Sequence, residues 1–171
     1  SARLAAAKPV TWRGQGDLGQ YTWTGNPMKG TWLAIDLCAC YSGLVIAMLC
    51  LGVHCYALAA ECNPVARECA AQVMPHIVHV DAVEKVNVRV LRDFLKRRKL
   101  RGILVGGGSP CQANSSLNVG RKGLGGLRSL QPQLLARLVD DLSHEPLCAD
   151  LEIVAFLENG DGPIRTEPLP P

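Results

Sequence analysis

Five short apolar runs alternate with four stretches of helical periodicity along this chain. The apolar runs have the length and composition of buried strands, and they lie at Trp32–Leu37, Cys55–Ala60, His76–Val80, Gly102–Val105 and Leu151–Leu157. Helices are predicted between them, at Gly43–Leu51, Val65–Val73, Val88–Lys99 and Leu130–Leu142. Strands that alternate with helices form parallel sheets with right-handed crossovers, so the pattern predicts an α/β fold.

Local signals support two of these helices. Asn63 is a favoured N-cap residue, and Pro64 suits the first position of the helix that follows it. The helix at Val88–Lys99 is amphipathic, and its inward side chains are predicted to be Val90, Leu91, Phe94 and Leu95. Residues 1–30 show little periodicity and are expected to form a loosely structured leader, with a short strand near Gln20–Thr24.

A polar or glycine-rich segment closes each predicted strand. These segments are Asp36, Glu61, Asp81, the stretch Gly106–Cys111, and Glu158 with Asn159. The carboxyl ends of parallel strands lie at one edge of the sheet, where ligands bind in such folds. Each acidic residue could instead only cap the next helix. Because all five strand ends share the feature, we predict one common site.

The length, composition and net charge of the chain narrow the class of protein. The 171 residues suit one domain, and a hydrophobic content of 48% is sufficient for a core although only 5% of residues are aromatic. The net charge of +3 permits a nucleic-acid partner without requiring one. The longest apolar stretch, Leu44–Val53, is too short to span a membrane, and we expect no signal peptide.

The eight cysteines point to a reducing compartment. None of them forms a C-x-x-C pair, so we expect neither a zinc site nor another metal centre. Most lie in apolar segments, as reduced buried thiols do. Cytosol or nucleus is therefore the expected location.

The heptapeptide G-G-G-S-P-C-Q at 106–112 holds the strongest candidate for chemistry. Its glycines permit close approach of backbone and ligand, and Pro110 restricts the backbone just before Cys111. A cysteine held in this way is a candidate nucleophile. On the heptapeptide alone, a tight turn in which Cys111 merely packs is an equal alternative.

Six motifs, in order, resemble those of the catalytic domain of DNA cytosine-5 methyltransferases, and in detail those of the de novo type. The resemblance runs from about Trp32 to Pro163. The motifs are I-D-L-C-A-C-Y-S-G at 35–43, A-A-E-C at 59–62, H-V-D-A-V at 79–83, S-P-C-Q at 109–112, N-V-G-R-K-G-L at 118–124 with Arg128 soon after, and F-L-E-N at 156–159.

This resemblance implies a Rossmann-like, S-adenosylmethionine-dependent methyltransferase fold with strand order 3-2-1-4-5. It also implies covalent catalysis, in which the Cys111 thiolate adds to carbon 6 of a cytosine and Glu158 holds ring nitrogen 3. Pro110 and Asn159 would place the base, which must leave the DNA stack. Arg121, Lys122 and Arg128 would contact phosphates, although ordinary solvated loop charge is their commoner role.

For the cofactor, the resemblance implies that Glu61 binds the ribose hydroxyls and that Asp81, beside Ala82, binds the adenine amino group. The segment from Asp36 to Gly43 would surround the methionine end. The implied cofactor residues are Asp36, Leu37, Cys38, Ser42, Gly43, Glu61, Cys62, Asp81, Ala82 and Gly107. The chain departs from the family here, because Cys38 replaces a Phe, and Cys40 and Ser42 replace glycines. We therefore expect weak cofactor binding.

The family continues beyond the last of these motifs with further strands, an arginine motif and a target-recognition region. We therefore expect a partial catalytic domain at 31–163, truncated after the fifth strand and followed by a Pro-rich tail at 164–171, with a C-terminal recognition region or partner chain supplying the remainder. A degenerate, non-catalytic relative and an RNA cytosine methyltransferase stay open as alternatives.

A basic run and the segment after the first strand also bear on the class of protein. The basic run from Lys96 to Arg101 could bind DNA, but the solvated end of a helix is the favoured interpretation. A nicotinamide-dependent dehydrogenase would require G-x-G-x-x-G after the first strand, and D-L-C-A-C-Y-S-G does not supply it.

Overall fold

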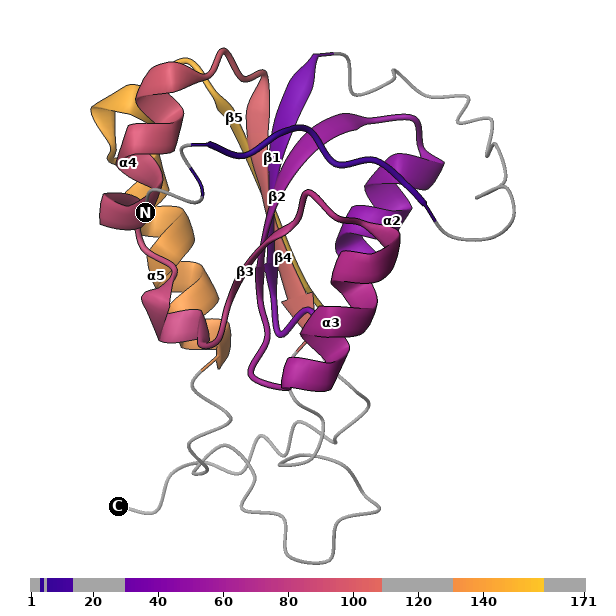
Figure 1. The fold of residues 1–171 in the computed structure, drawn as a ribbon. Coiled ribbons are helices and arrows are strands. Elements are labelled where there is room, and N and C mark those ends of the chain that lie inside the picture. The colour runs from indigo at the N-terminus through magenta and orange to yellow at the C-terminus, as the bar shows by residue number, and fades with distance from the viewer. Residues whose placement is uncertain (1–3, 5, 14–29, 109–130, 159–171) are drawn as a thin grey trace, which may run out of the picture.

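A computed structural model describes residue 4 and residues 6–13, 30–108 and 131–158. The described residues form three layers, with a parallel sheet between two pairs of helices (Figure 1). The strands are β1 (Thr31–Leu37), β2 (His54–Ala60), β3 (Val78–Val80), β4 (Gly102–Gly108) and β5 (Glu152–Glu158). The main helices are α2 (Gly43–Cys50), α3 (Pro64–Val73), α4 (Val88–Arg97) and α5 (Gln131–Ser143), with short 3-10 turns η1 (Val83–Lys85) and η5 (Pro146–Cys148).

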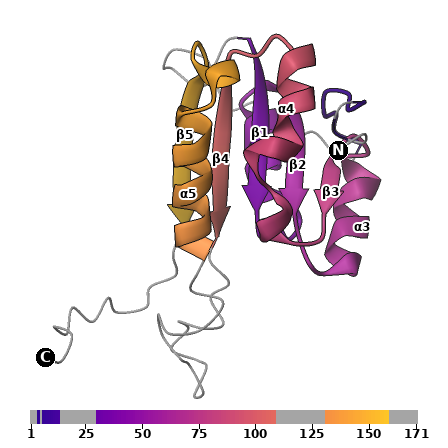
Figure 2. The ribbon, with the colours of Figure 1, turned by 90° about the vertical axis from the view of Figure 1, so that its left-hand side faces the viewer.

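The strand order is β3-β2-β1-β4-β5 and every pairing is parallel, as the sequence predicted. All strands therefore end at the same edge of the sheet (Figure 2). The register is continuous there: Leu37 pairs with Ala60 on one side and Gly107 on the other, and Gly108 pairs with Glu158.

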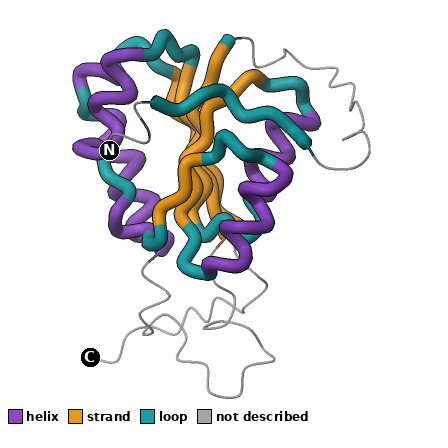
Figure 3. Tube along the Cα trace, viewed as in Figure 1, coloured by secondary structure: helices purple, strands orange, loops and turns teal. Residues whose placement is uncertain are grey.

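Helices α4 and α5 cover one face of the sheet, and α2 and α3 cover the other (Figures 1 and 3). Alternate residues of β1 supply the two cores, because successive side chains of a strand point to opposite faces. Leu33, Ile35 and Leu37 pack with the α4 and α5 side, whereas Trp32 and Ala34 pack with α2. The next residue on the α2 face is Asp36, so the alternation places a carboxyl group in an apolar layer.

The described part of the predicted leader packs against this domain. Leu4, Ala7 and Val10 are buried. Residues 6–13 cross in an extended path over the edge of the sheet that faces the viewer in Figure 3. The Val10 N–H donates a hydrogen bond to the Cys55 carbonyl at 2.8 Å. The expected strand near Gln20–Thr24 lies outside the described residues.

Several element boundaries differ from prediction. Strand β3 begins only at Val78, because Ile77 N–H is used in a turn to the Met74 carbonyl. Strand β4 continues to Gly108, since its glycines pair with β5 instead of starting a loop at 107. Helix α4 ends at Arg97, because Arg98 has an extended backbone.

Within α4, Leu91, Phe94 and Leu95 are buried as predicted, and Val90 is only partly buried. The Asn63 side chain caps α3 by accepting the Val65 N–H at 3.0 Å, with Pro64 at the first helical position. No helix among the described residues is long and apolar enough to cross a membrane.

Candidate active site

Asp36 lies at the carboxyl edge of the sheet, near the end of β1, and is only 4% exposed. Its carboxylate lies at the start of α2, where it accepts a hydrogen bond from the Leu44 N–H. Burial raises the pKa of Asp36 to about 7, against the lowering effect of the Leu44 hydrogen bond, and the nearby Glu61 carboxylate raises it further. Its Oδ2 atom is buried and has no hydrogen-bond partner among the described residues.

The loop from β1 to α2 has an unusual backbone. Cys38, Cys40 and Ser42 have φ values of 58°, 45° and 62°, in the left-handed region that favours glycine. The sequence resemblance singled out Cys40 and Ser42 as replacements for glycines. Ser42 is the buried N-cap residue of α2, yet its side chain makes no capping bond, and its Oγ has no partner in the described part of the chain.

Glu61 ties this loop to the end of β2. Its Oε2 accepts the Cys40 N–H at 2.7 Å, and its Oε1 accepts the Asn63 N–H at 2.7 Å and the Cys62 thiol at 3.6 Å. The Ala39 N–H also donates to the Ala60 carbonyl at 3.0 Å. The loop after β1 is thus held to the end of β2 by the Glu61 carboxylate and by this backbone hydrogen bond.

Sequence reasoning missed Arg67 and His79, which lie next to this carboxylate. The Arg67 guanidinium donates to the Glu61 carbonyl at 2.7 Å and to the Cys62 carbonyl at 3.4 Å. Burial lowers the pKa of His79, the Arg67 charge lowers it further, and Glu61 opposes them. Arg67 lies one helical turn after the N-cap residue Asn63. An arginine at that spacing can reach back to the carbonyls before the helix, and this was the sequence signal that could have identified it.

Asp81 lies beyond the end of β3, on the surface. It forms an exposed ion pair with Lys85 at 2.5 Å, and this hydrogen bond lowers the pKa of Asp81. Ala82 follows as the extended N-cap of η1. The position where the resemblance implies adenine binding is thus exposed at the surface.

The ends of β4 and β5 complete the edge. Gly107, expected near the cofactor, is a packing requirement as well, because a Cβ atom there would lie 2.3 Å from the Leu37 carbonyl oxygen. A Cβ at Gly106 would lie 2.4 Å from the Phe156 ring. Glu158 is the last residue of β5 and pairs with Gly108.

Five predicted positions therefore reach one edge through the described strands: Asp36, Glu61, Asp81, Gly107 and Glu158. Leu37, Cys38, Ser42, Gly43, Cys62 and Ala82 flank them on the adjoining segments. Pro110, Cys111, Asn159, Arg121, Lys122 and Arg128 lie outside the described residues, so their predicted roles stay predictions. No group of three or more potential metal ligands occurs in the described part of the chain.

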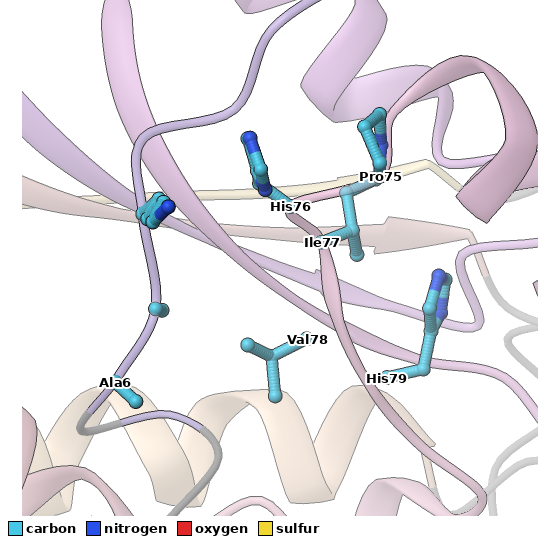
Figure 4. A pocket seen from close by; sticks show the side chains of 8 residues that line it. Ala6, Pro75, His76, Ile77, Val78 and His79 are labelled. Atoms are coloured by element: carbon cyan, nitrogen blue, oxygen red, sulfur yellow. The ribbon is translucent and has the colours of Figure 1, made fainter.

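A cavity of about 450 Å³ lies between residues 6–8 and the segment leading into β3 (Figure 4). His76, Ile77, Val78 and His79 line it from the β3 side. Both ring nitrogens of His79 are buried and have no hydrogen-bond partner among the described residues. Asp36, Glu61 and Asp81 do not line this cavity, and His79 is the lining residue that lies near Glu61.

The strand order and the polar carboxyl edge define the fold class: this is a Rossmann-like fold of the kind that methyltransferases have. No family model and no curated protein matches the chain. Among solved structures, it is similar to a presumed DNA modification methyltransferase encoded within an E. coli prophage, with 24% identity and a TM-score of 0.55. The match covers 79% of this chain and 34% of that one, so the chain spans about a third of that protein's length.

Proposed function

We propose that this chain contributes to the transfer of a methyl group from S-adenosylmethionine to carbon 5 of cytosine in DNA, through a covalent adduct with Cys111. The de novo type of DNA cytosine-5 methyltransferase is the closest in its motifs. The observation that carries this proposal is the pairing of Gly108 with Glu158. In the sequence, the Ser-Pro-Cys segment starts directly after Gly108, the residue that pairs with the candidate glutamate.

The described residues fit an S-adenosylmethionine molecule at this edge. Asp36 Oδ2 and Ser42 Oγ are buried polar atoms without hydrogen-bond partners among the residues that the structure describes, and a bound ligand could supply such partners. Asp36 and Glu61 place two carboxyl groups close together, an arrangement suited to a cationic ligand. When bound, S-adenosylmethionine supplies a methyl group on a positively charged sulfur.

The chain's own residues would act on the cytosine ring. The Cys111 thiolate forms a bond to carbon 6, and Glu158 shares a proton with ring nitrogen 3, which stabilises the resulting enamine. Carbon 5 is then nucleophilic enough to take up a methyl group. A water molecule then takes the proton from carbon 5 while the bond between carbon 6 and the Cys111 sulfur breaks, which restores the aromatic ring and the thiolate. Arg121, Lys122 and Arg128 would hold the backbone of the flipped strand.

The test is covalent trapping on duplex DNA that carries 5-fluorocytosine, with labelled S-adenosylmethionine. Fluorine at carbon 5 cannot leave as a proton does, so the adduct accumulates. We expect trapping that disappears in Cys111→Ala and persists in Cys69→Ala, a matched change at an exposed cysteine on α3. Trapping that survives Cys111→Ala would refute the assignment of the nucleophile. An RNA duplex with the same base tests the alternative substrate.

We also propose that efficient turnover requires a further polypeptide region against β5. Val154, Phe156 and Leu157 are exposed by 36%, 46% and 39%, although they lie in a regular strand. Base extrusion costs a few kcal/mol, which contacts to flanking nucleotides normally repay. A deficit of about 4 kcal/mol would slow the reaction nearly a thousandfold. We therefore expect slow trapping by this chain alone and faster trapping after the homologous region of a related enzyme is added.

A non-catalytic binding module is the second candidate. The non-glycine residues in the left-handed loop favour it, because side chains at Cys40 and Ser42 occupy positions where the family has none. Calorimetry of S-adenosylmethionine binding distinguishes the enzyme from the binding module. Absence of heat at millimolar S-adenosylmethionine, together with absence of trapping, would support the binding module and reject the enzyme.

A further inference from the structure

The outer surface of α4 and the turn after it carry a concentration of positive charge. Residues 89–101 contain seven of the 18 lysines and arginines of the chain and only one of its 15 acidic residues, Asp93. Since the whole chain carries +3, the remainder is net acidic. The charge is thus local to one element of the fold and is not a property of the whole chain.

Three of the seven cations have structural partners. Arg92 donates to Glu145 at 3.1 and 3.3 Å, and Glu145 is nearly buried. Arg101 pairs with Glu152 at 3.3 Å. The Arg98 guanidinium lies 5.4 Å from the Tyr56 ring centroid and donates to the Ala7 carbonyl at 3.1 Å. These three hold α4 and β4 to their neighbours.

The other four are Arg89, Lys96, Arg97 and Lys99, which we call the α4 basic cluster. All four are exposed, and none of them forms an ion pair within the described part of the chain. The nearest acidic residue on the helix is Asp93, one turn from both Arg89 and Arg97. Residues 89–99 thus contain one carboxylate and the four cations of the cluster.

The helix dipole explains only part of this cluster. Lys96 and Arg97 lie in the last turn of α4, where a cation is favoured. Arg89 lies in the first turn, where the dipole disfavours a cation and where α4 has no acidic residue. Lys99 lies beyond the end of the helix. The solvated helix end favoured from the sequence covers Lys96, Arg97 and Lys99, which precede β4, but it does not cover Arg89.

Helical spacing places Arg89 and Lys96 on the side of α4 opposite its buried residues Leu91, Phe94 and Leu95. Arg97 lies to one side of them, and Lys99 follows the end of the helix. Arg89 and Lys96 are two helical turns apart, about 10 Å. A phosphodiester strand presents one negative charge about every 3.4 Å of its axis, so several phosphates could meet these cations. We propose that the outer face of α4 binds the backbone of a nucleic acid.

The C-terminal part of this surface lies far from the candidate active site, whereas Arg89, in the first turn of α4, follows the carboxyl end of β3. Arg97 and Lys99 lie near the start of β4, whereas the Ser-Pro-Cys segment follows its end at Gly108. Seven residues of strand separate those points, about 23 Å. Figure 1 shows α4 on the face of the sheet away from α2 and α3. The proposal concerns contacts to the phosphodiester backbone of a nucleic acid, and it does not require the methyl transfer proposed above.

The experiment measures fluorescence anisotropy of a labelled 20-base-pair duplex that contains only A·T pairs, so no target cytosine is present. The test variant is Lys96→Gln/Arg97→Gln/Lys99→Gln, in which glutamine keeps the helix propensity. The control variant is Lys8→Gln/Arg13→Gln/Arg137→Gln, which removes three exposed cations elsewhere. Both variants should keep the wild-type melting temperature.

We expect the test variant to bind at least about tenfold more weakly at 100 mM KCl, and its salt slope, log K against log salt, to be smaller by about 2 to 3. The control variant should lose less than about threefold. Equal losses in both variants would show that net charge alone governs binding and would overturn the proposal. Unchanged binding in the test variant would also overturn it.

Single-stranded DNA and duplex RNA of matched length identify which phosphodiester is preferred. If the wild-type chain binds none of the three probes but binds polyglutamate, the cluster serves an acidic protein instead and the proposal fails. Trapping on 5-fluorocytosine DNA is measured separately, so failure of this proposal and failure of the proposed function are distinguishable.

Discussion

Glu61 accepts a hydrogen bond from the backbone N–H of Cys40 at 2.7 Å, although the two residues belong to loops after different strands. The Cys40 backbone has a left-handed conformation, and this contact helps to hold it there. The same Glu61 carboxylate raises the pKa of Asp36, after the larger effect of burial. One side chain thus shapes the loop and tunes the charge of its neighbour, so changes at Asp36, Ser42 and Glu61 will be coupled.

The first prediction concerns stability against pH. The pKa of Asp36 is about 7 in the folded state, against an ordinary value of 3.8. Between these pH values the folded state binds more protons, so the free energy of unfolding falls as pH rises from about 4 to 7, by up to about 4 kcal/mol. Asp36→Asn should abolish this fall and be more stable than wild type at pH 8.

Urea unfolding between pH 4.5 and 8 checks this. Asp81→Asn is the matched control, because Asp81 is exposed and its pKa is lowered, so it should leave the pH dependence in this range unchanged. A pH slope in Asp36→Asn equal to that of the wild type would contradict the prediction.

The second prediction concerns binding of S-adenosylmethionine and rests on the proposed function. A cationic ligand favours the ionised form of Asp36, so its affinity should rise with pH through about 7 and be about tenfold higher at pH 8 than at pH 6. Asp36→Asn should remove this dependence. Calorimetry measures both, and we expect a dissociation constant well above micromolar. Sub-micromolar binding by the wild type would show that Cys40 and Ser42 do not crowd the ligand.

The third prediction concerns the left-handed loop. Ser42→Gly removes a side chain at φ 62° and a buried hydroxyl group that has no partner in the described part of the chain. The relief of strain exceeds the entropy that glycine adds to the unfolded state, so we expect a gain of about 1 kcal/mol. Gly52→Ala is the converse control, since Gly52 has φ 68° with open space around it, and should lose about 1 kcal/mol. Thermal melts of both variants decide the matter, and a destabilised Ser42→Gly would show that the hydroxyl is needed.

The fourth prediction concerns the sheet edge. A Cβ at Gly107 would lie 2.3 Å from a backbone oxygen of β1, which cannot move without disturbing the sheet. Gly107→Ala should therefore lose about 3 kcal/mol. Gly43→Ala, where a Cβ meets nothing within 4 Å, should change stability by less than about 1 kcal/mol. Equal stability of the two variants in urea would refute the packing role of Gly107.

The fold was predictable because its determinants are local and periodic. Apolar runs such as Trp32–Leu37 and the cap formed by Asn63 and Pro64 give strand and helix positions directly, and parallel crossovers then restrict the topology. Element ends were less predictable. Gly106–Gly108 suggested a loop, but they pair with β5 across the sheet, and such pairing is not visible in the local sequence.

The candidate site was predictable in its carboxylates but not in its surroundings. Asp36 and Glu61 stand at strand ends, where the pattern marks them. The left-handed conformations at Cys38, Cys40 and Ser42 could not be derived from their residue types, which disfavour that region. The bonds of Arg67 to the carbonyls of Glu61 and Cys62 depend on where α3 packs.

The segment crossing the front of the sheet has a consequence for self-association. Strand β3 is so short that the first half of β2 has a strand neighbour only on its β1 side. On the other side, the Val10 N–H donates a hydrogen bond to the Cys55 carbonyl. An uncovered strand edge is a template for pairing between molecules. Residues 6–13 therefore shield the sheet against edge-to-edge aggregation, and a chain that began at Thr31 would lose that shield.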